Sequence, residues 1–225
     1  METPKQPNTI EQRILEGLAR VGIAMRMDDW EAAKTTGLNP TQLAILSLLE
    51  SRGPSGLGIK EIARGLGVTQ PTATDSVNAL EKKGCVSKAA DVRDKRSVKV
   101  SITNNGRDLL AEIDGKVGVL DRSISSLSIK ARTELLVTLV QLIQHLQQSE
   151  NFPVQRMCVT CKYFGPFANA DNTRPHQCYF VNAAFGQADL RIDCREQEPS
   201  SSARQAATWR RITGENPPSL TEGRD

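Results

Sequence analysis

Four of the five cysteines lie in the last third of this 225-residue chain. Their spacing is Cys158-x2-Cys161-x16-Cys178-x15-Cys194. A Cys-x2-Cys turn presents two thiolates to one centre, and four thiolates complete a tetrahedral zinc site or hold an iron–sulfur cluster. The spacing therefore predicts a metal centre with these four cysteines as ligands, in a small module at residues 151–198.

The type of metal follows less directly from the spacing. Structural zinc sites usually have two paired knuckles, whereas the third and fourth cysteines here stand singly. Aromatic residues are interleaved with the cysteines, and a dry shell of this kind tunes the potential of a cluster, although it could equally be the core of a zinc module. The spacing is similar to that of high-potential iron–sulfur proteins, so we expect a [4Fe-4S] cluster, with zinc as the alternative. Six of the nine aromatic residues lie between Cys158 and Cys194: Tyr163, Phe164, Phe167, Tyr179, Phe180 and Phe185.

Other interpretations of the thiols stay open. Four unliganded cysteines are the simplest, and a thioredoxin-like pair at Cys158 and Cys161 would need a βαβ unit that the pattern lacks. His176 could replace one ligand, although a hydrogen bond behind the cysteines or a surface position fits better. Cys85 stands alone, and we expect a small buried side chain there, with a redox-sensitive thiol as the alternative.

A second chemical signal is basic charge gathered on one segment. The whole chain carries only +3, but residues 59–103 hold nine basic and five acidic side chains. Three cations, Arg93, Lys95 and Arg96, lie in a six-residue charged turn at residues 91–96. Cations on such a turn can reach phosphates or a narrow minor groove, so the segment predicts a nucleic-acid contact.

The elements around this turn are those of a DNA reader. Two helices, at 59–66 and from Thr69 to Gly84, are joined by a tight turn and followed by strands at 85–89 and 97–102. If Ala73, Val77 and Leu80 are buried, the second helix presents a short polar face that can enter a major groove. The predicted base-reading residues on that face are Gln70, Thr72, Thr74, Asp75 and Asn78.

Helical periodicity organises the rest of the chain. We predict helices from Thr9 to before Gly37, over 40–52, from Thr103 to about Leu120, and a long leucine-rich helix from Ser128. The fold class is mainly α with a small β-wing, plus a cysteine-rich module and a disordered tail. The chain is predicted to begin with a flexible arm (1–9) and a winged helix–turn–helix that includes the first dimerisation helix (10–127) and ends in a serine-rich joint (121–127). A C-terminal dimerisation helix (128–150) and the cysteine-rich module (151–198) follow. The tail (199–225) is expected to be mostly disordered, with one short helix near 203–212.

The stretch QLAILSLLE…IKEIARGLGVTQPTATDSVNALEKKGCV…DVRDKRSVKVSITNNG resembles the winged helix–turn–helix of the MarR family of bacterial regulators. The likeness covers roughly residues 10–148 and implies a homodimer joined through its first and last helices, reading a pseudo-palindromic operator. It also implies that Arg93 enters the minor groove and that a small aromatic ligand can bind between the dimer helices and the DNA-binding lobe. Trp30, near the end of the first helix, is a candidate wall of that site. Asp75 departs from the family pattern, and we expect it to accept a hydrogen bond from a cytosine amino group.

These features favour a sequence-specific DNA-binding regulator whose four-cysteine centre senses redox or metal status or stabilises the dimer. The alternative is a redox or electron-transfer metalloprotein that uses the helix–turn–helix as a scaffold. Two histidines and the lack of any Ser-His-Asp pattern argue against a hydrolytic enzyme. No apolar run reaches the length of a membrane span and the N-terminus lacks a signal-like stretch, so a cytoplasmic location is expected.

Overall fold

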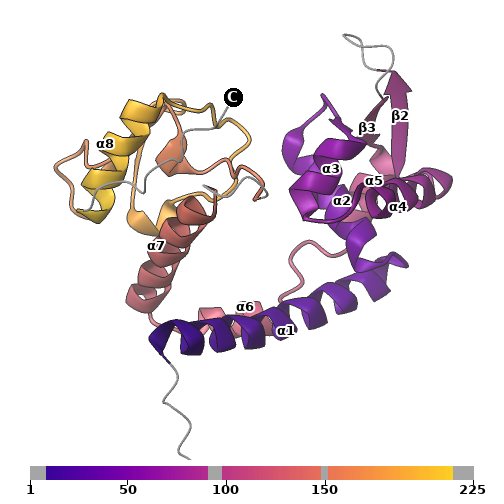
Figure 1. Ribbon diagram of the computed structural model, residues 1–225, viewed down its shortest axis with the longest axis horizontal. Helices are drawn as coiled ribbons and strands as arrows, with labels where there is room; N and C mark the ends of the chain where they lie inside the picture. The colour runs from indigo at the N-terminus through magenta and orange to yellow at the C-terminus, as the bar shows by residue number, and fades with distance from the viewer. Residues whose placement is uncertain (1–8, 91–97, 148–151, 215–225) are drawn as a thin grey trace, which may run out of the picture.

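The computed structural model describes residues 9–90, 98–147 and 152–214, which form two lobes on a shared base. The base consists of the long helix α1 (Ile10–Thr36) with the short helix α6 (Val119–Ser125) alongside it (Figure 1). One lobe, here called the winged lobe, spans residues 38–113. The other, the cysteine lobe, consists of α7 (Ile129–Leu146) and residues 152–214.

Local capping explains where the predicted helices begin. A side-chain oxygen at each N-cap accepts a hydrogen bond from a backbone N–H in the first turn, which is unpaired inside the helix. The caps are Thr9, Asn39, Thr69, Thr103 and Ser128. The helices of the winged lobe are α2 (Pro40–Arg52), α3 (Ile59–Leu66), α4 (Gln70–Lys82) and α5 (Asn104–Ala111).

The wing is an antiparallel hairpin with a short third strand. β2 (Val86–Ala90) pairs with β3 (Val98–Ile102), and β1 (Leu57–Gly58) pairs with the other edge of β3. The sequence did not predict β1, because two residues are too few to show a period. The charged turn at 91–96 lies outside the described residues.

The winged lobe packs around apolar side chains from all its elements. Ile45 and Leu46 of α2, Ile62 of α3 and Val77 of α4 are fully buried, and Val100 of the wing completes the contact. The three helices therefore hold one another and the wing in a fixed arrangement, which sets the direction in which α4 faces solvent.

Two expectations for the region after the wing are wrong. The predicted helix from Thr103 to about Leu120 ends at Ala111, and the predicted serine-rich joint forms helix α6. Between the two helices the chain turns at Gly115, whose φ of 76° does not continue a helix. The second helix is anchored by Asp28 of α1, whose carboxylate oxygens accept hydrogen bonds from the N–H groups of Val119 and Leu120 at 2.8 and 2.9 Å. These bonds lower the pKa of Asp28 and start a new helix there.

The cysteine lobe has its own small core. A three-stranded sheet, in the order β4 (Phe164–Gly165), β5 (His176–Cys178) and β6 (Ala183–Phe185), packs with α7 and two short 3-10 turns, η1 (Cys158–Thr160) and η2 (Gln187–Asp189). Val140 of α7, Met157 and Phe164 are buried at its centre. The leucine-rich face of α7, which we expected to pack on another helix, is thus partly covered by this module.

The C-terminal segment extends this lobe beyond the predicted boundary at residue 198. Helix α8 (Ser202–Thr213) lies within the segment expected to be mostly disordered, near the short helix predicted at 203–212. Trp209 of α8 is buried, and its ring meets the edge of His145 on α7 with centroids 5.5 Å apart. Residues 1–8 of the predicted arm and 215–225 of the predicted tail lie outside the described residues.

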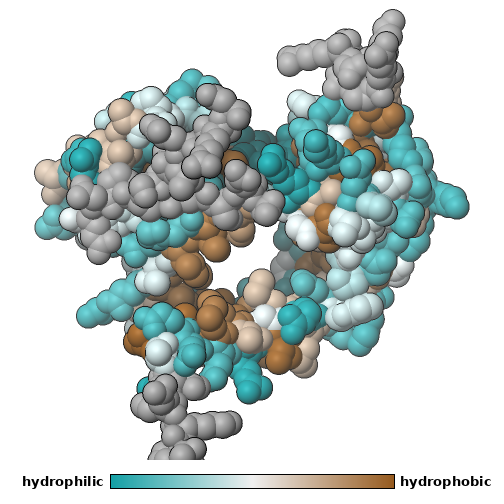
Figure 2. Space-filling view, in the orientation of Figure 1, coloured by the Kyte–Doolittle hydropathy of each residue, from teal (hydrophilic) through white to brown (hydrophobic). Residues whose placement is uncertain are grey.

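The base helices leave much apolar surface uncovered. Five apolar side chains that recur along α1 are between 42% and 69% exposed: Ile10, Ile14, Leu18, Val21 and Met25. Brown side chains gather along α7 and the adjoining part of the base, beside the opening between the lobes (Figure 2). Among the described residues, no helix is both long enough and apolar enough to cross a membrane.

Candidate DNA-binding surface and cysteine centre

Helix α4 presents the polar face that the sequence predicted. Ala73, Val77 and Leu80 are fully buried, so the helix is anchored on its apolar side. Of the predicted base-reading residues, Gln70, Thr72 and Asp75 are exposed, whereas Thr74 and Asn78 are half-buried. Thr69 and Thr72 share a hydrogen bond of 2.7 Å between their hydroxyl oxygens, which holds the N-terminal turn that would meet base edges.

A lysine that the sequence did not single out ties this helix to the wing. Lys88 of β2 donates from Nζ to Asn78 Oδ1 at 2.5 Å and to Glu81 Oε2 at 2.7 Å, both on α4. The Oδ1 of Asn78 is therefore engaged inside the protein. Arg93, Lys95 and Arg96, the predicted wing contacts, lie outside the described residues.

The base of the wing is built by a Thr-x-x-Gly sequence. The Thr103 hydroxyl donates to the carbonyl oxygen of Gly84 at 2.7 Å, and it accepts from the N–H of Gly106 at 3.2 Å. The N–H of Thr103 in turn donates to the carbonyl oxygen of Cys85 at 3.0 Å. Cys85 is buried here, as expected, and burial raises the pKa of its thiol.

The four clustered cysteines line one cavity of about 200 Å³ in the cysteine lobe. Their chain positions come from different elements: Cys158 opens η1, Cys161 follows it, Cys178 ends β5, and Cys194 lies after η2. All four are free thiols. Within the described part of the chain, no three Cys, His, Asp or Glu side chains lie close enough together to hold a single metal ion.

Several N–H groups point at these sulfurs. The backbone N–H of Arg191 donates to Cys158 Sγ at 3.3 Å, and its guanidinium Nη1 lies 3.8 Å from Cys194 Sγ. The N–H of Tyr163 donates to Cys161 Sγ at 3.5 Å. Hydrogen bonds of this kind stabilise sulfur that carries negative charge, as it does when it ligates a metal.

Burial is the main obstacle to ionising the thiol of Cys158 in the absence of a cation. Burial raises the pKa of Cys158 to about 11; the hydrogen bond from the N–H of Arg191 lowers it, and the neighbouring Cys194, Cys161 and Cys178 raise it further. Four thiolates in one cavity repel one another, and a bound cation is what reverses this balance.

The aromatic shell is smaller than the sequence predicted. Tyr163, Phe164, Phe180 and Phe185 line the cavity, but Phe167 and Tyr179 do not. The ring of Tyr179 instead covers Gly165, where an added Cβ would lie 2.8 Å from it.

His176 is a core residue, which the sequence did not predict. It is 1% exposed, packs against Phe164, Phe167 and Phe185 at ring-centroid distances of 4.9 to 5.5 Å, and does not line the cavity. Its Nδ1 accepts a hydrogen bond from the N–H of Phe167 at 3.3 Å, and burial lowers its pKa.

Comparisons with known proteins agree with the architecture of the winged lobe. A family model described as the MarR family matches residues 38–98. An uncharacterized HTH-type transcriptional regulator, YkoM of Bacillus subtilis (strain 168), is 33% identical over 116 residues, which are 51% of this chain and 74% of the relative.

Solved structures share the fold. A MarR transcriptional regulator from Methanosarcina mazei Go1 superposes with a TM-score of 0.53 at 18% identity, covering 60% of this chain and 96% of that one. The transcriptional repressor CouR bound to a 23-mer DNA duplex gives 0.50 at 24% identity, covering 62% and 99%. Both matches cover nearly the whole of the other protein but leave over a third of this chain unmatched. The chain belongs to the MarR family and is a winged helix–turn–helix transcriptional regulator that carries an additional four-cysteine lobe.

Proposed function

We propose that the protein binds a pseudo-palindromic operator as a homodimer, with one α4 helix in the major groove of each half-site. The polar face of α4 and the charged turn at 91–96 support this proposal, because base edges and phosphates need such side chains. The uncovered apolar faces of α1 and α7 supply the surface that a second copy would bury.

The test of this proposal is enrichment of bound sequences from a random duplex pool, followed by affinity measurements in graded salt. A dimer on DNA predicts an inverted repeat with half-sites about one helical turn apart. It also predicts that affinity falls steeply with salt, as phosphate contacts require. A redox protein that uses the fold only as a scaffold would enrich no sequence.

For the cysteine lobe we propose a [4Fe-4S] cluster held by Cys158, Cys161, Cys178 and Cys194. The observation that carries this proposal is that all four thiols line one cavity together with four aromatic side chains. A zinc ion needs its four sulfurs about 2.3 Å from one point, whereas a cluster spreads its ligands over several iron atoms. When bound, such a cluster supplies one-electron redox chemistry and sensitivity to oxidants.

This chain's own residues would hold and shield the cluster. The four cysteines ligate it, the N–H groups of Tyr163 and Arg191 stabilise ligand sulfur, and Phe164 and Phe185 exclude water. The lobe would then report redox or metal status to the regulator or stiffen the dimer, since its core is continuous with the dimerisation helix α7 through Val140.

The composition of the purified protein tests this assignment. Protein prepared without oxygen should contain iron and sulfide and show a broad absorbance band near ~400 nm. Cys178→Ser should remove iron, sulfide and colour, whereas Cys85→Ala, which changes a cysteine of the winged lobe, should retain them. Stoichiometric zinc without colour would contradict the cluster and assign a structural metal module instead.

Binding of a small aromatic ligand is a second candidate activity. Two hollows of about 300 and 410 Å³ on α1 and the start of α2 share Arg26 and Trp30, a cation beside an aromatic wall. Such a pair suits an aromatic carboxylate. Titration with aromatic acids should quench the fluorescence of Trp30 in the Trp209→Phe variant, and Arg26→Ala should abolish the response. A response unaffected by Arg26→Ala would argue against this site.

A further inference from the structure

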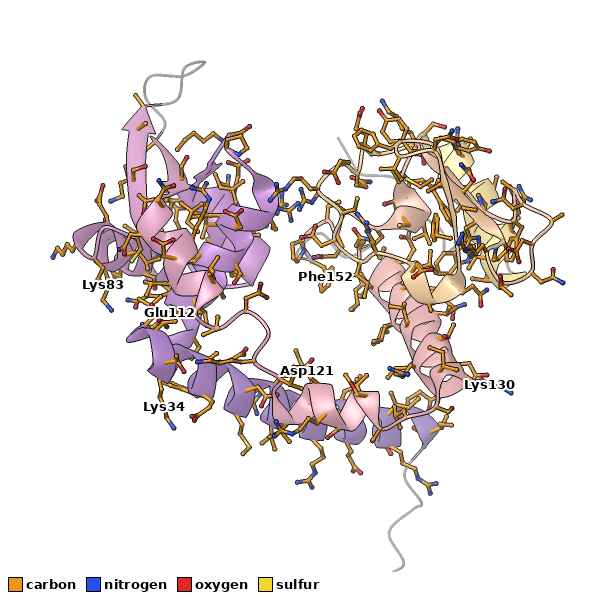
Figure 3. All side chains as sticks on the ribbon, turned by 180° about the vertical axis from the view of Figure 1, so that it is seen from behind. Lys34, Lys83, Glu112, Asp121, Lys130 and Phe152 are labelled. Atoms are coloured by element: carbon orange, nitrogen blue, oxygen red, sulfur yellow. The ribbon has the colours of Figure 1, made fainter. Side chains whose placement is uncertain are left out.

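The two lobes meet at the C-terminal end of α2. The contact comes from two segments of the cysteine lobe, residues 156–158 and 191–195, which run side by side. The N–H of Cys194 donates to the carbonyl oxygen of Arg156 at 3.0 Å, and the N–H of Cys158 donates to the carbonyl oxygen of Arg191 at 3.0 Å. These segments contain two of the four proposed ligands. Side chains from both lobes fill the space where the lobes approach each other (Figure 3).

Two arginines of these segments bind the last carbonyl groups of α2. Arg195 Nη2 donates to the carbonyl oxygen of Glu50 at 2.7 Å, and Arg156 Nη2 donates to that of Ser51 at 3.0 Å. Carbonyl groups in the last turn of a helix lack partners inside it and lie at the negative end of its dipole. The arginines therefore act as a C-terminal cap that is supplied by the other lobe.

An acidic residue locks this cap in place. Asp193 Oδ1 lies 2.7 Å from Arg156 Nε and 3.7 Å from Arg52 Nη1, so one carboxylate joins an arginine from each lobe. Burial alone would raise the pKa of Asp193, but the hydrogen bond and charge of Arg156 and the charge of Arg52 lower it overall. The side chain of Arg156 is only 15% exposed, so solvent screens this pair weakly.

The ligand Cys194 lies between the two residues that make the contact. Asp193 precedes it and Arg195 follows it, while Arg156 is two residues before Cys158. A backbone shift at Cys158 or Cys194 is therefore passed directly to the side chains that hold α2.

The other side of the contact leads to the DNA-binding surface. Glu50 also accepts from Arg107 Nε of α5 at 2.9 Å, and Arg195 lies 3.7 Å from its second carboxylate oxygen. Beyond Gly53 the chain turns into β1, where Leu57 pairs with Val100 of the wing. The end of α2 is thus one short turn from the sheet that carries the wing.

We propose that Arg156, Asp193 and Arg195 form an interlobe bridge that couples the ligation state of the cysteine centre to the DNA-binding lobe. The proposal rests on the cluster assigned above. With the centre loaded, the bridge caps α2 and fixes the wing strands; loss of the centre releases the two ligand segments and the cap. Operator affinity consequently depends on the state of a centre that does not itself touch DNA.

The test compares loaded and metal-stripped full-length protein in two measurements: operator affinity, and backbone hydrogen exchange over residues 46–53. Stripping the wild type should change affinity by about 5- to 150-fold, the usual range of allosteric coupling, and should speed exchange in this segment. Asp193→Asn and Arg195→Ala should keep full iron and sulfide but show fast exchange in both states and an affinity ratio near unity. Arg210→Ala, which changes an exposed arginine of α8 in the same lobe, is the matched control and should behave as wild type.

The possible failures are distinguishable. Protein without iron and sulfide refutes the proposed cluster. A loaded protein whose affinity and exchange are unchanged by stripping refutes the coupling. A loaded Asp193→Asn or Arg195→Ala variant that responds to stripping as strongly as the wild type shows that the signal takes another route and overturns the role of the bridge.

Discussion

Gly106 is the position where the Thr-x-x-Gly sequence at the base of the wing can be tested most directly. Its Cα faces the wing so closely that a Cβ added there would lie 2.3 Å from the carbonyl oxygen of Cys85 and 2.8 Å from Ile102 Cγ1. Neither atom is free to move. The carbonyl oxygen already accepts the N–H of Thr103, and Ile102 belongs to the buried core.

Two opposing effects decide the outcome of Gly106→Ala. Replacing glycine by alanine inside a helix normally stabilises it by about 0.5–1 kcal/mol. Forcing a methyl group into a packed contact costs about 1–3 kcal/mol, because backbone and core must shift. The steric cost is larger here, because the carbonyl oxygen of Cys85 would have to move by roughly 1 Å to reach normal van der Waals distance. We expect a net loss of about 1–2 kcal/mol in the free energy of unfolding.

Urea unfolding followed by circular dichroism measures this loss as a lower midpoint at unchanged slope. Gly17→Ala is the control, because this α1 glycine has no heavy atom within 4 Å of an added Cβ, and it should be neutral or stabilising. Operator affinity of Gly106→Ala should fall as well, since α5 supports the wing. A Gly106→Ala protein as stable as Gly17→Ala would refute the reasoning.

Three other predictions follow from the site. Lys88→Met frees Asn78 and Glu81 from the wing, so stability should fall by under about 1 kcal/mol while operator affinity, measured by fluorescence anisotropy, falls several-fold. Asp75→Asn should change the preference for one base over the others, at one position of each half-site, by about 1–3 kcal/mol in binding free energy. Affinities for operators that differ at single positions measure this preference, and an unchanged preference would mean that Asp75 contacts no base. The folded-state pKa of Asp193 lies below its ordinary value of 3.8, so its contribution to stability is present above pH ~4 and is lost as pH falls through the lower folded-state pKa. Melting temperatures between pH ~5 and ~2 should therefore fall less for Asp193→Asn than for the wild type.

The sequence determined the features that depend on neighbouring residues. Helix starts at Asn39, Thr69 and Ser128 were predictable because an N-cap binds N–H groups only two or three residues away. The polar face of α4 was also predictable from neighbouring residues, because Ala73 and Val77 recur at helical spacing and mark the buried side of the helix. The cysteine spacing predicted a common metal centre; the four thiols do line one cavity, and the metal itself stays a prediction.

Tertiary structure decided everything that joins distant residues. Asp28 accepts a hydrogen bond from the first turn of α6 across 91 positions, and no local pattern around residue 119 predicts that contact. The spacing could not tell whether four sulfurs meet at a point or surround a cavity, because that depends on the packing of the sheet around them. The bridge between Arg195 and Glu50 spans 145 positions, and no local pattern encodes such a contact. Capping and periodicity act within a few residues, whereas the partners of a charged side chain are chosen by the packing of whole lobes.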